Sequence, residues 1–291
     1  MPEIRTSGTS APNRFGSLLL HWRQLRHKSQ LALANDADVS PRHLCFVETG
    51  RARPSRDMVL TLARVLEVPL REQNALLLAA GFAPLYRETP LEAPELAAAR
   101  KALDTILRHH EPLPAVVMNR RWDILETNSA ADRFFALLLD SKVPASPNVI
   151  RLVFDPEGLR PLISNWETVA ESLIHRVHRE AVGGVPDAET SRLLEQALAF
   201  PGVPRRFRIP DFETPLSPIV PIGFAKGALT FHYFSTVTTL GTPQDVTLQE
   251  LRIECFFPMD EQTAQNARRL AASPAEPSGA PTSPEPARLA Q

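Results

Sequence analysis

The chain has 291 residues, 43% of them hydrophobic and 22% charged, with a formal net charge of −1, which suits a globular protein with room for two domains. No apolar run approaches the roughly 20 residues that span a bilayer, and the first residues lack the basic-then-apolar order of a signal peptide. We therefore expect a cytoplasmic protein without membrane insertion.

The charge is distributed unevenly along the chain. Residues 1–81 contain 11 Lys and Arg against 7 Asp and Glu, a balance of +4, whereas residues 82–291 contain 21 against 26, a balance of −5. Arginine supplies 28 of the 32 basic residues, but genome base composition also produces such a bias. We therefore judge each arginine by its position in the chain and not by the total number. Cys45 and Cys255 have no metal-ligand spacing and argue against a disulfide or zinc framework.

Residues 14–81, called the head below, have the pattern of five helices. The run RFGSLLLHWRQLRHKS carries apolar residues at i, i+3, i+4 spacing and predicts an amphipathic helix that ends before Ser29, which caps the second helix. Ser40 is a good N-cap, and Pro41 suits the first position of a third helix because its missing N–H costs nothing there. Two further helices are expected over residues 56–66 and 70–80, with Gly81 as the C-cap.

The third helix presents polar side chains at its start. Leu44 and Val47 recur at i, i+3 and should face inward, which turns Arg42, His43 and Phe46 outward. A capped helix, a tight turn and a second helix with outward Arg and His at its tip is the geometry that enters a DNA major groove. For Phe46, contact with a thymine methyl and packing beside a helix crossing both stay open.

The head resembles the XRE family of helix-turn-helix regulators, the lambda and 434 repressor class. The likeness is carried by Gln30, Ala34, the turn, the run from Glu48 to Arg51, and Arg53-Pro54-Ser55. Aspartate stands at position 38, where the family usually has glycine, and we expect it to tolerate the left-handed backbone region with some strain.

This resemblance implies roles for individual residues of the head. Arg42 and His43 would read bases, and Gln30 would contact a phosphate or a base edge. Arg23 and Glu48 would form a largely buried ion pair between the first and third helices. The full DNA-contacting set is then Gln30, Ser40, Arg42, His43, Phe46, Arg51 and Arg53, with Ser40 and Arg51 holding phosphates.

The segment after the head is rich in proline up to residue 95, and residues 94–110 then predict a helix that links two domains. Residues 111–266, called the body below, open with a short strand over 115–118, a turn, a second strand over 122–127 and a helix capped at Asn128. This order, in which two strands joined by a turn precede an Asn-capped helix, is typical of the start of a PAS-like sensor domain. Further helices are expected over residues 161–182 and 187–200, and closing strands over 227–240 and 246–258.

The last predicted strand alternates in polarity. Leu251 and Ile253 alternate with Glu250, Arg252 and Glu254, which predicts one apolar face and one solvated face. An antiparallel sheet with helices on one face follows. Its inward side chains either fill a core or supply the wall of a site for an apolar ligand, and both readings stay open: Phe134, Phe135, Leu138, Phe231, Tyr233, Leu251 and Ile253.

The whole chain resembles a narrower family, the MmyB-like transcription regulators. The likeness is carried by SPRHLCFVETGRARPSRDMVL, AAGFAP, NRRWDILETNSAA, NVIRLVFDP and LGTPQDVTLQELRIECFFP. It implies an XRE head joined to a PAS-like body that holds a fatty acid or a similar apolar molecule. One of Arg133, Arg205 or Arg206 would anchor a carboxylate, and the residues do not decide which.

The expected fold is α+β with two domains: an all-α, five-helix, lambda-repressor-like helix-turn-helix domain, then a PAS-like antiparallel sheet with helices. We expect a bacterial, nucleoid-associated regulator that binds a double-stranded DNA operator as a homodimer and needs no cofactor. The predicted boundaries are 14–81 for the helix-turn-helix domain, 82–110 for a linker and connecting helix, 111–266 for the ligand-binding domain and 272–291 for a disordered tail.

Two other readings of the body stay open. It would serve only to dimerise if its interior were tightly packed and empty. A self-cleaving repressor needs an Ala-Gly bond and a lysine-activated serine, for which Ala80-Gly81 and Lys226 are the superficial candidates. The histidines lack convincing metal-ligand spacing, so we expect neither a metal site nor an enzyme.

Overall fold

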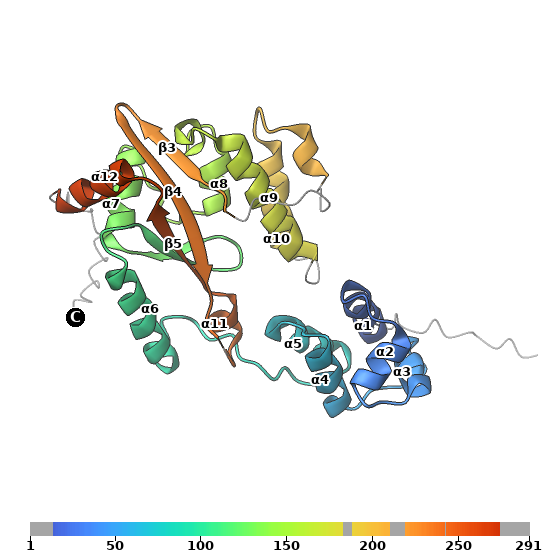
Figure 1. Ribbon diagram of the computed structural model, residues 1–291. Helices are drawn as coiled ribbons and strands as arrows, with labels where there is room; N and C mark the ends of the chain where they lie inside the picture. Colours follow the sequence, from blue (N-terminus) through green and yellow to red (C-terminus); the bar gives the residue numbers. More distant parts are fainter. Residues whose placement is uncertain (1–13, 183–187, 210–218, 242, 274–291) are drawn as a thin grey trace, which may run out of the picture.

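The structure is a computed structural model that describes residues 14–182, 188–209, 219–241 and 243–273 (Figure 1). It has two domains, a helical head and a body built on a sheet. The disordered tail predicted from the sequence lies outside the described residues from position 274 onward. No helix in the described ranges is long and apolar enough to cross a membrane.

The five predicted helices of the head are confirmed. They pack around fully buried side chains, among them Trp22, Leu33 and Leu44, because each helix places its apolar stripe toward the others. The helices are α1 (Arg14–Leu25), α2 (Gln30–Asp36), α3 (Pro41–Glu48), α4 (Arg56–Val65) and α5 (Leu70–Ala79).

The turn that joins α2 to α3 has the predicted geometry. Ser29 Oγ accepts a hydrogen bond from the Ala32 N–H at 3.0 Å, and Ser40 Oγ accepts one from the His43 N–H at 3.5 Å, so both serines cap their helices. Asp38 has a φ of +52°, in the left-handed region expected for this position. The turn therefore keeps the helix-turn-helix angle without glycine.

The body contains a five-stranded antiparallel sheet in the order β2-β1-β5-β4-β3. The prediction for the last strand is wrong at its start, because Asp245 Oδ1 accepts hydrogen bonds from the N–H groups of Thr247 and Leu248 and begins a short helix there. Strand β3 was not predicted from the sequence. The strands are β1 (Ala115–Met118), β2 (Ile124–Thr127), β3 (Ile222–Lys226), β4 (Leu229–Thr238) and β5 (Arg252–Pro258), with α11 (Val246–Glu250) before β5.

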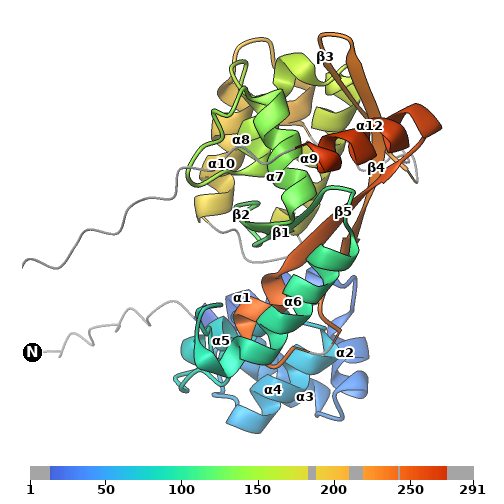
Figure 2. The same cartoon turned by 90° about the vertical axis from the view of Figure 1, so that its left-hand side faces the viewer.

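Helices cover both faces of this sheet, not one face as predicted (Figures 1 and 2). The helix that was predicted as a connection packs Leu103 and Leu107 against Val117 and Ile253 of the sheet. It consists of η1 (Pro94–Leu96) and α6 (Ala97–His109). On the other face lie α7 (Ser129–Leu138), α8 (Val149–Phe154), η2 (Arg160–Leu162), α9 (Trp166–Val182), α10 (Ala188–Ala199), η3 (Arg205–Arg208) and α12 (Glu261–Ala272).

Candidate DNA interface and ligand cavity

The start of α3 carries the exposed basic residues predicted to read DNA. Leu44 and Val47 are completely buried, and this fixes the rotation of α3 about its axis. Arg42 and His43 are consequently exposed at its first turn. Since the first turn of a recognition helix is the part that reaches base edges, the described head has the shape that DNA readout requires.

Phe46 lies beside two of the predicted DNA-contacting arginines. The Arg42 guanidinium lies 5.4 Å from the centre of the Phe46 ring, and that of Arg51 lies 6.0 Å from it. Cation–π contacts of this kind restrict long side chains that would otherwise be mobile. The half-buried ring thus organises the two cations, which is a role beyond the thymine contact and the helix packing expected from the sequence.

Gln30, Ser40 and Arg53 occupy different environments in the head. Gln30 is half-buried and donates a hydrogen bond from Nε2 to Glu48 Oε2. Ser40 uses its oxygen as the α3 cap, which leaves its hydroxyl hydrogen able to donate to a phosphate. Arg53 is exposed in the segment between α3 and α4. Of these three residues, Gln30 is the one whose side chain would have to give up a partner on another helix to contact DNA.

The ion pair between Arg23 and Glu48 joins α1 to α3. Arg23 donates from Nε at 3.1 Å and from Nη2 at 2.7 Å to Glu48 Oε1, and from Nη1 to the Lys28 carbonyl at 3.0 Å. The exposed fractions of the two side chains are 15% and 5%. Both charges are therefore largely removed from water, and each depends on the other.

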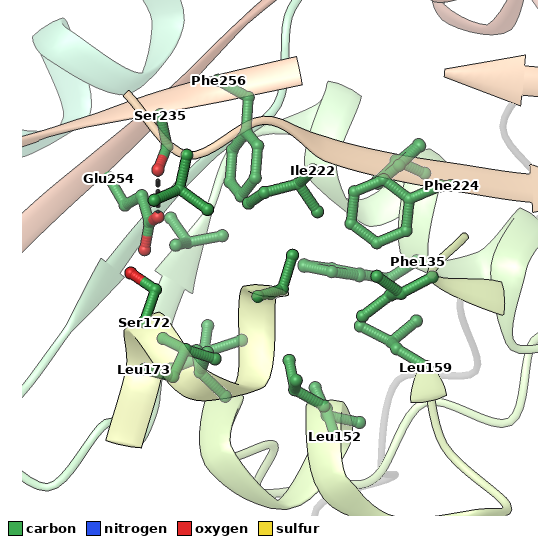
Figure 3. Close-up of a pocket in the computed structure, with 18 of the residues that line it drawn as sticks. Phe135, Leu152, Leu159, Ser172, Leu173, Ile222, Phe224, Ser235, Glu254 and Phe256 are labelled. Carbon is green, nitrogen blue, oxygen red and sulfur yellow. Dashed lines mark hydrogen bonds between the residues drawn. The ribbon is translucent and has the colours of Figure 1, made fainter. Parts of the chain in front are cut away.

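The body contains a cavity of about 110 Å³ between the sheet and the helices α7, α8 and α9 (Figure 3). Its wall is mostly apolar, which is the usual composition of a small-molecule site. Side chains on β3, β4 and β5 face it from one side and helical side chains from the other. The apolar lining includes Phe135, Leu152, Leu159, Leu173, Ile222, Phe224 and Phe256.

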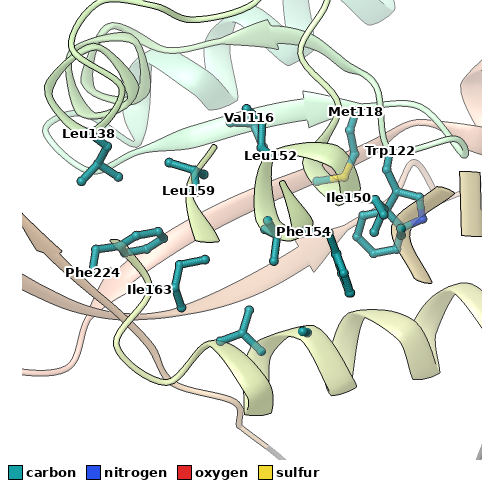
Figure 4. Packing of buried hydrophobic residues seen from close by; sticks show 14 of the residues in the cluster. Val116, Met118, Trp122, Leu138, Ile150, Leu152, Phe154, Leu159, Ile163 and Phe224 are labelled. Carbon is teal, nitrogen blue, oxygen red and sulfur yellow. The ribbon is translucent and has the colours of Figure 1, made fainter. Parts of the chain in front are cut away.

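The predicted ligand-binding residues are distributed over three places. Phe134 and Phe135 line the cavity. Leu138, Phe231 and Tyr233 belong to the buried cluster around it, without lining it. Figure 4 shows Leu138 in this cluster. The cluster also includes Phe154 and Trp122, so the cavity is embedded in a packed core, and the second group shapes it indirectly.

For Leu251 and Ile253 the prediction is wrong, because these side chains face α6 on the opposite side of the sheet. Directly paired residues of antiparallel strands share a face. Ile253 pairs with Val117, which packs toward α6, whereas Glu254 pairs with Val116, which lines the cavity. The face of β5 assigned to solvent from the sequence is therefore the face that meets the cavity.

Polar residues missed by the sequence analysis lie in the cavity wall: Ser172, Arg176, Ser235 and Glu254. One feature of the sequence does indicate that both faces of the sheet are covered. The apolar stripe of residues 94–110 needs a surface to pack on, and the second face of the sheet provides it. None of the three arginines proposed as a carboxylate anchor lines the cavity. Arg205 and Arg206 are exposed, with Arg206 Nη2 2.6 Å from Glu167, and Arg133 is half-buried.

The head contacts the body through α5 and α11. Arg71 of α5 pairs with Glu250 of α11, with 2.7 Å between Nε and Oε1, and also with Glu88. Gln249 Oε1 accepts a hydrogen bond from the Leu70 N–H at 2.7 Å, at the start of α5. The N-cap residue of this helix is Pro69, which makes no side-chain cap hydrogen bond. The hydrogen bonds from Arg71 lower the pKa of Glu88, which keeps this contact ionised near neutral pH.

The described residues contain no group of three His, Cys, Asp or Glu side chains placed to hold a metal ion. Burial, followed by the charge of Glu254, raises the pKa of the Cys255 thiol. A thiol in such surroundings stays protonated and is a poor nucleophile or ligand.

Two family models match this chain. The model described as the MmyB-like transcription regulator ligand binding domain matches residues 99–270, and a helix-turn-helix model matches residues 19–73. No curated protein matches the chain. The first match spans the sheet, α6 and the cavity, and the second spans most of the head.

Proposed function

Because the chain belongs to the MmyB-like transcription regulators, with a helix-turn-helix head and a ligand-binding domain, we propose that it binds a two-fold DNA operator as a homodimer and that an apolar ligand changes this binding. One observation carries the DNA part, namely that α3 presents exposed Arg42 and His43 in a capped helix-turn-helix. The dimer follows from size, since one short helix reads too few base pairs for useful specificity.

Footprinting of the purified protein on its own upstream region tests this proposal. We expect two protected half-sites about one helical turn apart, because paired heads meet one face of the duplex. Sedimentation of the protein with the protected fragment should give two chains per fragment. A single protected half-site with one chain bound would contradict the dimer, and an absence of any protected sequence would contradict operator recognition at that region.

The ligand part of the proposal is supported by the cavity and its mostly apolar wall. A fatty acid is the candidate that the family resemblance implies. The alternative in which the body only dimerises would suit a fully packed interior better than this one. The self-cleaving alternative is disfavoured, because Lys226 Nζ lies 2.6 Å from Asp140 Oδ1 and donates to the Leu138 carbonyl, and so serves a structural role.

The contact between α5 and α11 supplies a route from the cavity to the head. Strand β5, which carries Glu254 and Phe256 in the cavity wall, begins two residues after α11 ends. A displacement of β5 by a ligand would therefore move Gln249 and Glu250, and with them the start of α5. A ligand acts on DNA binding only if it binds two such arrangements with different affinities.

Removal of this contact is expected to uncouple the two domains. In the double variant Gln249→Ala, Glu250→Gln, α5 loses its cap and Arg71 loses its anionic partner on α11. The ratio of operator affinities with and without ligand, typically about 5- to 150-fold in coupled systems, should fall close to one. Fluorescence anisotropy on a labelled operator measures this ratio.

The matched control is Gln265→Ala, Glu195→Gln, which makes the same chemical changes at exposed positions on α12 and α10. The control should keep the ratio of the unaltered protein. If the α11 double variant kept it as well, the coupling would not pass through α11 and this part of the proposal would be wrong.

A further inference from the structure

Phe46 lies outside the packed core of the head. Its ring is half-buried, but it is not a member of the cluster of apolar side chains that forms this core. Two guanidinium groups lie over the ring instead, that of Arg42 at 5.4 Å and that of Arg51 at 6.0 Å from its centre. These contacts indicate a role in holding the two arginines and not in packing one helix on another.

The backbone fixes both arginines relative to the ring. Arg42 precedes Phe46 by four residues, so the two side chains are neighbours on one face of α3. After α3 the chain turns back, and the Phe46 carbonyl accepts hydrogen bonds from the N–H groups of Arg51 at 2.7 Å and Ala52 at 3.1 Å. One ring thus receives a cation from the first turn of α3 and a second cation from the segment that follows this helix.

An aromatic ring holds an arginine without using its hydrogen bonds, because a guanidinium over a ring face keeps its in-plane N–H groups able to donate. Arg23 of the same domain is held differently, since its donors are directed at Glu48. In the part of the chain that the structure describes, neither Arg42 nor Arg51 forms an ion pair with an Asp or Glu side chain. Both cations are therefore held in place and still able to donate to DNA.

We propose that Phe46 is a positioning residue that couples the base contact of Arg42 to the phosphate contact of Arg51. This inference rests on the proposed DNA binding, which assigns these contacts to the two arginines. The ring holds both guanidinium groups in place before DNA binds, so less side-chain freedom is lost in the complex. Each cation in turn restrains the ring, and the loss of one cation loosens the other.

The competing role for Phe46 is direct contact with a thymine methyl group. Leucine keeps an apolar surface that meets a methyl group but has no π face for a cation, so the variant Phe46→Leu separates the two roles. Figures 1 and 2 show α3 on the side of the head that is turned away from the body. A change at Phe46 is therefore remote from the contact between the domains.

The experiment measures the affinity of the full chain for two labelled duplexes of equal length, one from its own upstream region and one of random sequence. For Phe46→Leu we expect about 5- to 30-fold weaker binding to both duplexes, which is the loss of two exposed cation–π contacts. The upstream duplex should lose more than the random one, because the base contact of Arg42 adds to its affinity. Phe46→Tyr keeps the ring and should stay within about twofold of the unaltered protein.

The matched control is Phe82→Leu, the same change at a half-buried ring that packs on the core of the head. This control should bind both duplexes as tightly as the unaltered protein does. An equal loss in Phe46→Leu and Phe82→Leu would assign the effect to the fold and overturn the positioning role.

The coupling itself is measured by a double-mutant cycle of Arg42→Ala and Arg51→Ala on the random duplex. The loss in the double variant should be smaller than the product of the two single losses by about threefold or more, because each single variant already loosens the other cation. In the Phe46→Leu background the losses should multiply. If they multiplied in the unaltered background as well, the coupling would be disproved, and this arm needs no change at Phe46.

The outcomes separate this inference from the proposed function. If the unaltered protein binds neither duplex, the proposed DNA binding fails and the inference fails with it. If the unaltered protein binds and Phe46→Leu binds equally tightly, DNA binding stands and the positioning role is overturned. A loss confined to the upstream duplex, matched by the loss of the unaltered protein on the same duplex with deoxyuridine in place of thymine, would assign Phe46 to a thymine methyl group instead.

Discussion

Replacing Glu48 by alanine is expected to destabilise the head by about 3 to 5 kcal/mol, because it leaves the Arg23 guanidinium buried without its anionic partner. Domains of this size are stable by only about 5 to 15 kcal/mol, so the loss would take a large share of the total. Hydrogen exchange measured by mass spectrometry on the full chain should show faster exchange throughout α1 and α3, with little change in the sheet.

The size of this effect follows from the number of groups that depend on Glu48. Its two oxygens accept from Arg23 and from Gln30, so one carboxylate joins α1, α2 and α3. The matched control is Asp36→Ala, which breaks the exposed pair between Lys28 and Asp36 on the same domain. An exposed pair contributes about 0 to 1 kcal/mol. Equal protection in Glu48→Ala and Asp36→Ala would contradict the buried-pair argument.

The head could be predicted almost completely from its sequence, because its boundaries depend on local chemistry. Ser29, Ser40 and Ser55 each cap the helix that follows them. Asp38 adopts the left-handed conformation that the turn needs, and Gly81 has a φ of +90° just after α5. Caps and turn residues act over three or four positions, so a single sequence displays them.

The body was predicted less well, because its faces depend on contacts between distant segments. The alternation in β5 was recognised, but a period of two does not say which face is covered. The packing of α6 on one face and of α7, α8 and α9 on the other decides that Ile253 and Glu254 are both buried. The assignment of Glu254 to solvent failed for this reason.

The contact between the two domains could not be predicted from local sequence patterns. Leu70 and Gln249 are 179 positions apart, as are Arg71 and Glu250, and neither pair belongs to a recognisable motif. The structure also gives a reason for the unusual start of α5, where Pro69 provides no side-chain cap and Gln249 of the body supplies the acceptor. Helix α5 is therefore the part of the head whose first turn depends on the body.

The side chains that we expect to read DNA lie at the N-terminal turn of α3, whereas the ion pair with Arg23 holds the C-terminal end of this helix. Because α3 is held at its C-terminal end by Glu48, substitutions at its exposed N-terminal turn should leave the fold intact. Changes in stability and changes in recognition are then separable by position. Such a separation is required before a loss of DNA binding is attributed to a lost base contact.

Replacing Arg42 by alanine is expected to cost about 1 to 3 kcal/mol of discrimination at one operator position, because the exposed first turn of α3 would lose the guanidinium that we propose to pair with a guanine edge. Affinities measured by anisotropy against a panel of single-base operator variants should become equal at that position and stay ordered elsewhere. Arg51→Ala, which would remove the phosphate contact that we propose for this residue, should weaken all variants alike and lower the salt slope by about one. Arg64→Ala, an exposed position on α4, is the control. If Arg42→Ala kept the ranking of the whole panel and matched the salt behaviour of Arg51→Ala, Arg42 would be a phosphate contact, and the reading of bases would belong to His43 or to another part of α3.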